Sequence, residues 1–201
     1  MFPALTPATR AIILVNVLVF ILEYVAMQPI LLHFALWPLG PGSFFRPWQL
    51  VTYAFLHDGV LHIFFNMFAL YVFGPALEQY WGPRRYLGYY FVCVIAAGAT
   101  QLAVEHLTGS LGATIGASGG IFGILLAFAI LFPRVRLLLY FAIPMPAWLF
   151  VSGYAVLELF FGVTGTEAGI AHFAHLGGML GGAVMMLYWR LRADRGGWRR
   201  G

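Results

Sequence analysis

The chain has 201 residues, of which 62% are hydrophobic and only 9% are charged. Soluble domains carry about 25% charged residues, so this composition excludes a soluble globular domain. Eleven basic residues against seven acidic ones give a net charge of +4. The basic residues follow membrane topology, as shown below, so no nucleic-acid partner is expected. The single cysteine, Cys93, excludes a disulfide framework and a cysteine-based metal site.

Long apolar runs predict an all-α fold, a polytopic membrane helical bundle of six transmembrane helices, as a single domain over residues 1–201. The first run is too long for a cleaved signal peptide and is interpreted as a retained span. Pro144 and Pro146 are expected to kink the fifth span near its start. The predicted spans cover residues 11–27, 61–80, 86–104, 117–132, 137–161 and 168–189.

The distribution of arginine predicts the orientation of these spans. All eleven basic residues are arginines, and ten of them flank one set of span ends, whereas only Arg46 lies in a connection on the opposite side. Basic residues are enriched in the cytoplasmic connections of membrane proteins. Both termini are therefore expected to be cytoplasmic, and the second, fourth and sixth spans are expected to run from outside to inside.

The first outside connection, residues 28–60, does not have the composition of a solvated loop. It contains Trp37, Trp48, four phenylalanines and several prolines, with almost no charge. Aromatic side chains at the headgroup level are typical of segments that lie in the membrane interface. The segment is therefore predicted to lie in the interface, and a short re-entrant hairpin with only a packing role is the alternative.

Polar side chains near the outer ends of the even-numbered spans are the candidate functional groups, because polar and ionisable groups are costly inside a bilayer. Asn66, Ser118 and His175 lie 15 or 16 residues from the cytoplasmic ends of their spans. At about 1.5 Å per residue, this places them about 22–24 Å above the inner boundary of a core that is about 30 Å thick. The three groups are therefore expected to share one level below the outer surface.

Glycines spaced four residues apart accompany both the serine and the histidine. This spacing lets helix backbones approach closely, and a serine needs close approach to reach a histidine on another helix at about 2.6–3.2 Å. Ser118 also lies at a predicted helix N-terminus, where free backbone N–H groups can stabilise an oxyanion. The pattern favours Ser118 as a nucleophile and His175 as its general base. The glycine pairs are Gly116/Gly120, Gly119/Gly123, Gly177/Gly181 and Gly178/Gly182.

Three motifs, taken in order, resemble those of the rhomboid family of intramembrane serine proteases. Gly116-Ala117-Ser118-Gly119 is similar to the family's GxSG motif, whose serine is the nucleophile. The sequence from Ala174 to Gly178 resembles the sixth-span motif, whose histidine, here His175, is the general base. His57, His62 and Asn66 resemble the second-span pattern, which implies that His62 and Asn66 help to form the oxyanion hole. The resemblance covers nearly the whole chain from about Trp48 onward.

Two positions depart from the family pattern. Trp48-Gln49 stands where well-studied bacterial members often carry Trp-Arg, and Phe122 stands where a tyrosine often stacks on the catalytic histidine. The Phe122 ring can still stack, so tuning of activity is expected rather than its loss. His172 is expected to pack or to form interfacial hydrogen bonds rather than to act in catalysis.

The resemblance implies hydrolysis of peptide bonds in or near the transmembrane segments of membrane proteins by a Ser–His dyad, without a cofactor or a metal. No acid is expected to orient His175, because Asp58 lies in the outer loop and Asp194 lies in the tail. The zinc and aspartyl classes of intramembrane protease lack their groups here, since there is no HExxH motif and no aspartate within a span.

The alternative function is that of a rhomboid-like protein that binds membrane clients without cutting them. A small transporter is a weaker alternative, since the spans show no clear inverted repeat. The expected partners are transmembrane protein substrates and the lipid bilayer. The expected location is a bacterial inner membrane, and the sequence does not indicate an oligomeric state.

Overall fold

The long helices of the protein correspond closely to its apolar runs. A computed structural model describes residues 4–109, 111–139, 143–165 and 171–195. A short helix α2 (Gln49–Thr52) and a 3-10 turn η1 (Tyr53–Phe55) precede α3, and strands β1 (Arg136–Leu139) and β2 (Ile143–Pro146) precede α6. The described chain is an all-α membrane bundle with one small hairpin, which confirms the predicted fold class. Its long helices are α1 (Pro7–Phe34), α3 (Val60–Trp81), α4 (Pro83–Thr108), α5 (Ser118–Leu131), α6 (Ala147–Thr164) and α7 (His172–Arg195).

Four of the described helices, α1, α3, α4 and α6, are long and apolar enough to cross a membrane, and α5 is a shorter apolar helix. Large hydrophobic side chains on the outer faces of α1 and α6 are exposed, among them Leu18, Val25, Val156 and Val163. Extended apolar surface of this kind fits a lipid environment. The protein is therefore a polytopic helical membrane protein, and the count of six spans stays a prediction.

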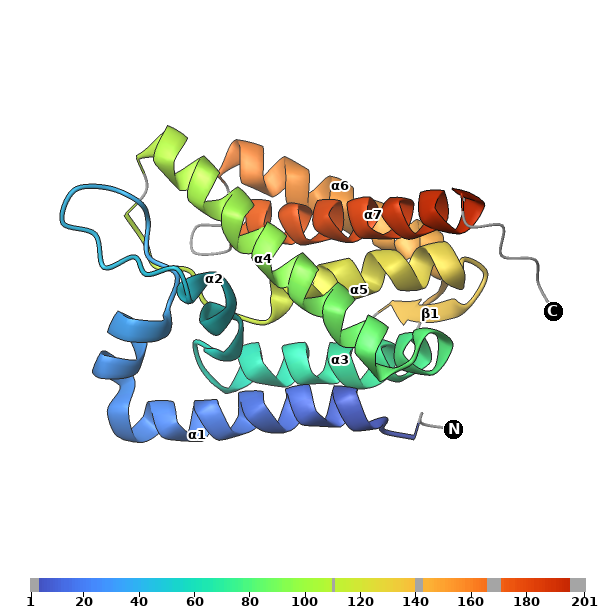
Figure 1. Ribbon diagram of the computed structural model, residues 1–201, viewed down its shortest axis with the longest axis horizontal. Coiled ribbons are helices and arrows are strands. Elements are labelled where there is room, and N and C mark those ends of the chain that lie inside the picture. Colours follow the sequence, from blue (N-terminus) through green and yellow to red (C-terminus); the bar gives the residue numbers. More distant parts are fainter. Residues whose placement is uncertain (1–3, 110, 140–142, 166–170, 196–201) are drawn as a thin grey trace.

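Helix α4 runs diagonally across one face of the bundle. It crosses α5 and α7 diagonally and packs against both, while α1 and α3 lie side by side along one edge (Figure 1). Its inward face is fully buried at Tyr86, Tyr89, Tyr90, Cys93 and Val94. The start of α1, the α3–α4 turn, the hairpin and the end of α7 gather at one end of the bundle (Figure 1).

Helix α1 extends beyond the predicted first span and is kinked. Ala26 has non-helical φ and ψ angles of −140° and 44°, three residues before Pro29, whose ring removes a backbone donor and clashes with the preceding turn. Residues 28–34, predicted to begin the interfacial loop, instead form the last turns of α1 after this kink. The prediction failed there because proline is tolerated in the first turn of a new helical segment.

Gln49, where the sequence departs from the family pattern, organises the connection between α1 and α3. Its buried amide donates hydrogen bonds to the carbonyls of His33 and Phe44 at 3.3 and 3.1 Å. Its carbonyl oxygen accepts from the backbone N–H groups of Trp37 and Arg46 at 3.3 and 3.1 Å. An arginine has no acceptor, so it could not make the second pair of bonds.

The prediction of a fifth span over residues 137–161 is wrong at its start. β1 and β2 pair as an antiparallel hairpin with Arg136 opposite Pro146, and α6 begins only at Ala147. Pro144 and Pro146 do not kink a helix. They exclude one, because proline lacks the N–H that the helix needs and its ring clashes with the preceding turn. A two-stranded hairpin tolerates them because both strands are edge strands.

The predicted sixth span begins at residue 168. Residues 168–170 lie outside the described residues, and α7 begins at His172.

Glu78, near the end of α3, anchors the start of α1. Its buried carboxylate accepts hydrogen bonds from the backbone N–H groups of Ala8 and Thr9 at 2.9 and 2.8 Å. The hydroxyls of Thr6 and Thr9 also donate to it. The first N–H groups of a helix have no partner within the helix. Glu78 supplies that partner from another helix and so ties α1 to α3.

Glu78→Gln is expected to lower the free energy of unfolding by about 1.5–3 kcal/mol, since hydrogen bonds to a charged acceptor are lost in a buried site. Thermal unfolding in detergent, followed by tryptophan fluorescence, measures the change. Thr6→Val removes only one donor and should have a smaller effect. An unchanged midpoint for Glu78→Gln would contradict the anchoring role.

Candidate active site

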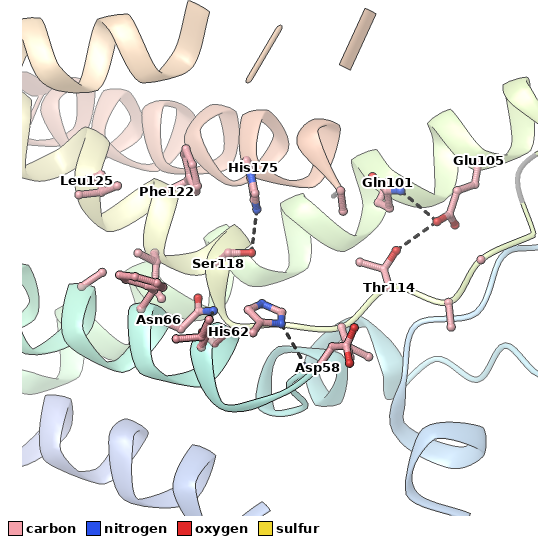
Figure 2. A pocket seen from close by; sticks show the side chains of 18 residues that line it. Asp58, His62, Asn66, Gln101, Glu105, Thr114, Ser118, Phe122, Leu125 and His175 are labelled. Atoms are coloured by element: carbon pink, nitrogen blue, oxygen red, sulfur yellow. Dashed lines mark hydrogen bonds between the residues drawn. The ribbon is translucent and has the colours of Figure 1, made fainter. Parts of the chain in front are cut away.

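Ser118 and His175 meet between two helices. Ser118 is the first residue of α5, and His175 lies in the first turn of α7. The Nε2 atom of His175 is 2.8 Å from the Oγ atom of Ser118 (Figure 2), which is a hydrogen-bond distance. The serine hydroxyl can donate to Nε2 when the ring proton is on Nδ1. This arrangement allows the histidine to take the proton of the serine.

Glycines, which have no side chain, explain how α5 and α7 come so close. A Cβ atom on Gly178 would lie 1.8 Å from the carbonyl oxygen of Gly119, so the two backbones are in direct contact there. Other glycines of the same stripes face α4: a Cβ on Gly120 would lie 2.5 Å from Tyr90, and one on Gly181 would lie 2.4 Å from Ala96. The glycines of α5 and α7 therefore allow three helices, α4, α5 and α7, to pack closely together. The sequence spacing predicted the approach of α5 and α7 but not the part played by α4.

Phe122 holds the ring of His175 in place. It lies about one turn after Ser118 on α5, and its ring stacks on that of His175 with centroids 4.2 Å apart and planes 7° apart. Stacking needs only the face of the ring. The phenylalanine therefore orients the histidine without the hydroxyl of the tyrosine that the family pattern often has.

Ser118 lines a cavity, and His62, on α3, faces it from the other side of this cavity (Figure 2). Its Nδ1 atom accepts a hydrogen bond from the backbone N–H of Asp58 at 3.2 Å, so its proton resides on Nε2. A Cβ atom on Gly116 would lie 2.8 Å from this Nε2 atom and 3.7 Å from Ser118 Oγ. The Nε2–H donor of His62 is therefore aimed into the space beside the serine.

Asn66 lies one turn further along α3 and lines the same space. Its amide nitrogen donates one hydrogen bond to the His62 carbonyl at 2.9 Å. An asparagine amide has two N–H donors, so the second can serve another acceptor. His62 and Asn66 thus place two donors on the side of Ser118 opposite His175.

His57, the other residue of the second-span pattern, has a different position. It is fully buried before α3, and its ring makes an edge contact with His62 at a centroid distance of 5.0 Å. Burial is the main cause that lowers the pKa of His57 to about 3, and the neighbouring His62 adds to it. A neutral His57 packs behind His62 and does not reach Ser118.

The serine and the histidine open into a cavity of about 710 Å³. A second polar group lies at its other end, where Glu105 accepts hydrogen bonds from Gln101 and Thr114 at 3.0 and 3.1 Å (Figure 2). A cavity of this size with a few polar groups is typical of a binding site. The sequence motifs did not indicate these residues, although a glutamine within a predicted span is a signal that could have found them.

Glu158 is the most important residue of the site that the sequence motifs did not indicate. It is buried on α6, and its Oε2 atom lies 2.7 Å from Nδ1 of His172 and 2.9 Å from Nδ1 of His175. The first contact is a hydrogen bond; in the second, the ring N–H is not aligned on the oxygen. The expectation that no acid lies near His175 is therefore wrong. It considered only aspartates, although a glutamate within a predicted span is itself a functional signal.

Glu158, His172 and His175 are also a group whose donor atoms, all within 4.8 Å of one another, could hold a metal ion. A tetrahedral Zn²⁺ at about 2.0–2.2 Å from each ligand needs donor atoms roughly 3.3 Å apart. The contacts here are shorter, at 2.7 and 2.9 Å. In this arrangement Glu158 pairs with His172, and the donor atoms lie closer together than the ligands of a zinc ion do.

Comparison with known proteins identifies the family of the chain. The family model for the Rhomboid domain matches residues 45–192. The chain belongs to the rhomboid family. It is 32% identical over 149 residues to Rhomboid protein 1, mitochondrial, of Saccharomyces cerevisiae, covering 70% of this chain and 41% of that protein. It is 30% identical over 205 residues to RHOMBOID-like protein 12, mitochondrial, of Arabidopsis thaliana, covering 92% and 58%.

A bacterial rhomboid protein shows a similar relation over most of the chain. Rhomboid protease GlpG of Yersinia pestis is 25% identical over 195 residues, which cover 92% of this chain and 63% of that protein. The chain spans about half the length of the curated relatives it matches. The similarity therefore concerns the rhomboid domain that the relatives share with this chain.

Gly178→Ala is expected to push α7 away from α5 in this rhomboid and to separate His175 from Ser118. Labelling of the serine by a fluorophosphonate should fall by about 100-fold, the effect of a misplacement of about 1 Å. Gly88→Ala on α4 is the matched control, because a Cβ there meets nothing within 4 Å. Labelling of the Gly178 variant at the rate of the unmutated protein would show that the contact does not set the distance.

Proposed function

We propose that this protein is an intramembrane serine protease that hydrolyses peptide bonds in or near the transmembrane segments of other membrane proteins. The observation that carries the proposal is the 2.8 Å contact between His175 Nε2 and Ser118 Oγ at the wall of a cavity within a membrane bundle. Membership of the rhomboid family supports it, since relatives of this chain include proteins named rhomboid protease.

The reaction would proceed through a covalent intermediate. His175 takes the proton of Ser118 while the serine oxygen attacks the carbonyl carbon of the scissile bond. The tetrahedral intermediate collapses, the C–N bond breaks, and the protonated His175 gives its proton to the leaving amine. The same histidine then activates a water molecule, which hydrolyses the ester and restores Ser118.

Three donors would hold the negative oxygen of the tetrahedral intermediate. His62 Nε2–H and the second N–H of Asn66 face the serine from α3, and the backbone N–H of Ser118 lies at the N-terminus of α5. Donors of this kind are each worth about 3–4 kcal/mol in the transition state. They replace the water that would solvate the oxyanion outside the membrane.

The substrates would be transmembrane segments with helix-breaking residues near the outer leaflet. A regular helix engages its carbonyls in i→i−4 hydrogen bonds, so a segment must unwind before its carbonyl can reach Ser118. The asymmetry of the arginines supports cytoplasmic termini. Six spans and a bacterial inner membrane are part of the same proposal. Access would be controlled by the fifth span and residues 162–167, of which 166 and 167 lie outside the described residues, as the family resemblance implies.

Reconstitution with a transmembrane reporter tests the chemistry. The unmutated protein should cleave the reporter, and Ser118→Ala and His175→Ala should each reduce cleavage by about 10⁴-fold or more, as expected for members of one catalytic unit. Cleavage that survives Ser118→Ala would refute the mechanism. Capture of varied reporters without any cleavage would favour the function of a client-binding protein.

Asn66→Ala and His62→Ala test the oxyanion donors. Each should lower kcat by about 10²–10³-fold with little change in KM, because the lost interaction forms in the transition state. Gln79→Ala removes an exposed amide from the same helix and should keep kcat near that of the unmutated protein. A rise in KM with unchanged kcat would instead assign the two residues to substrate binding.

A further inference from the structure

We infer that Glu158 is a positioning residue for His175, so that the working unit is Ser118–His175–Glu158 rather than a serine–histidine pair alone. The inference rests on the proposed function, because it assigns a role in the same reaction. It adds an acid from α6 to a site otherwise built by α3, α5 and α7.

The contacts follow the order that such a unit requires. Ser118 Oγ lies 2.8 Å from Nε2 of His175, and Nδ1 on the other side of the ring lies 2.9 Å from Oε2 of Glu158. Nε2 can accept the serine proton only if Nδ1 carries the ring proton. A carboxylate beside Nδ1 stabilises that tautomer, and it stabilises the imidazolium that forms when Ser118 attacks.

Burial strengthens the interaction of the Glu158 carboxylate with His175. Glu158 and His175 are only 7% and 8% exposed, and a charge in such surroundings is strongly unfavourable unless it is paired. Among the described residues, the ion-pair partners of Glu158 are His172 and His175 alone. Within the described part of the chain, the negative charge of Glu158 is therefore balanced through these two rings.

His172 explains how Glu158 is held in place. Its Nδ1 atom makes the 2.7 Å hydrogen bond to the same Oε2 atom that contacts His175. Residues three apart lie on one face of a helix, so both rings project from α7 toward α6, with centroids 6.4 Å apart and planes 88° apart. His172 anchors the carboxylate, and a small rotation of that group aligns it with the Nδ1–H of His175 once the ring becomes charged.

The first test compares two glutamine variants of the full chain in the reporter assay. Glu158→Gln keeps the shape of the side chain but removes its charge, and kcat should fall by about 10²–10⁴-fold with KM unchanged, because the loss falls on the transition state. Glu158→Asp keeps the charge and should retain part of this activity. Glu78→Gln is the matched control, since Glu78 is also buried but contacts the start of α1. It should lower the melting temperature while the folded protein keeps its kcat.

A second measurement does not depend on cleavage. Nitrogen NMR of the histidine-labelled protein in detergent should show His175 protonated at Nδ1, with the resonance assigned by its loss in His175→Ala. The resonance should shift in Glu158→Gln and stay unchanged in Glu78→Gln. If the unmutated protein cleaves no reporter but this shift is seen, the proposed function fails while the positioning role stands.

Three results would overturn the inference. The first is Glu158→Gln with the kcat of the unmutated protein, in a preparation in which Ser118→Ala abolishes cleavage. The second is a His175 resonance that does not respond to Glu158→Gln. The third is inhibition by added Zn²⁺ that a chelator relieves and Glu158→Gln abolishes, since the cluster would then be a metal site.

Discussion

The contact between the backbones of α5 and α7 at Gly119 and Gly178 is the constraint on which the site depends. No other residue type fits, because a Cβ on Gly178 would lie 1.8 Å from a carbonyl oxygen. Without a hydrophobic driving force between helices in lipid, association depends on such close packing. Ser118 directly precedes Gly119, and His175 is three residues before Gly178, so the contact that joins the helices also sets the distance between the two side chains.

The second constraint is that every buried acid needs donors. Glu78 accepts from the start of α1, Glu105 from Gln101 and Thr114, and Glu158 from a histidine on α7. Each acid links two parts of the chain: Glu78 over 70 positions, Glu158 over 14, and Glu105 only from α4 to the loop that follows it. These links form because an unpaired charge in an apolar interior is very unfavourable. Glu78 does this at the start of a helix, far from the serine. Glu105 does it in the wall of the cavity, and Glu158 does it beside His175.

The sequence predicted the features that depend on period, depth and composition, and it missed those that depend on tertiary contact. Counting residues placed Asn66, Ser118 and His175 at one level, and the structure puts all three around one cavity. The hairpin before α6 was missed because apolar strands and helix ends cannot be distinguished by composition alone. Glu158 was missed because its role follows from the packing of α6 on α7, which no local pattern encodes.

The packing of α6 on α7 depends on a glycine, as the contact between α5 and α7 does. A Cβ on Gly162 of α6 would lie 3.2 Å from the Cβ of His172, so α6 approaches α7 closely one turn after Glu158. Most other large side chains of α6, such as Val156 and Val163, are exposed on its outer face. The small contact surface between α6 and α7 thus places the carboxylate of Glu158 next to His175. If α6 moves to admit a substrate, as proposed above, Glu158 moves with it, and substrate access would then be coupled to the orientation of the histidine.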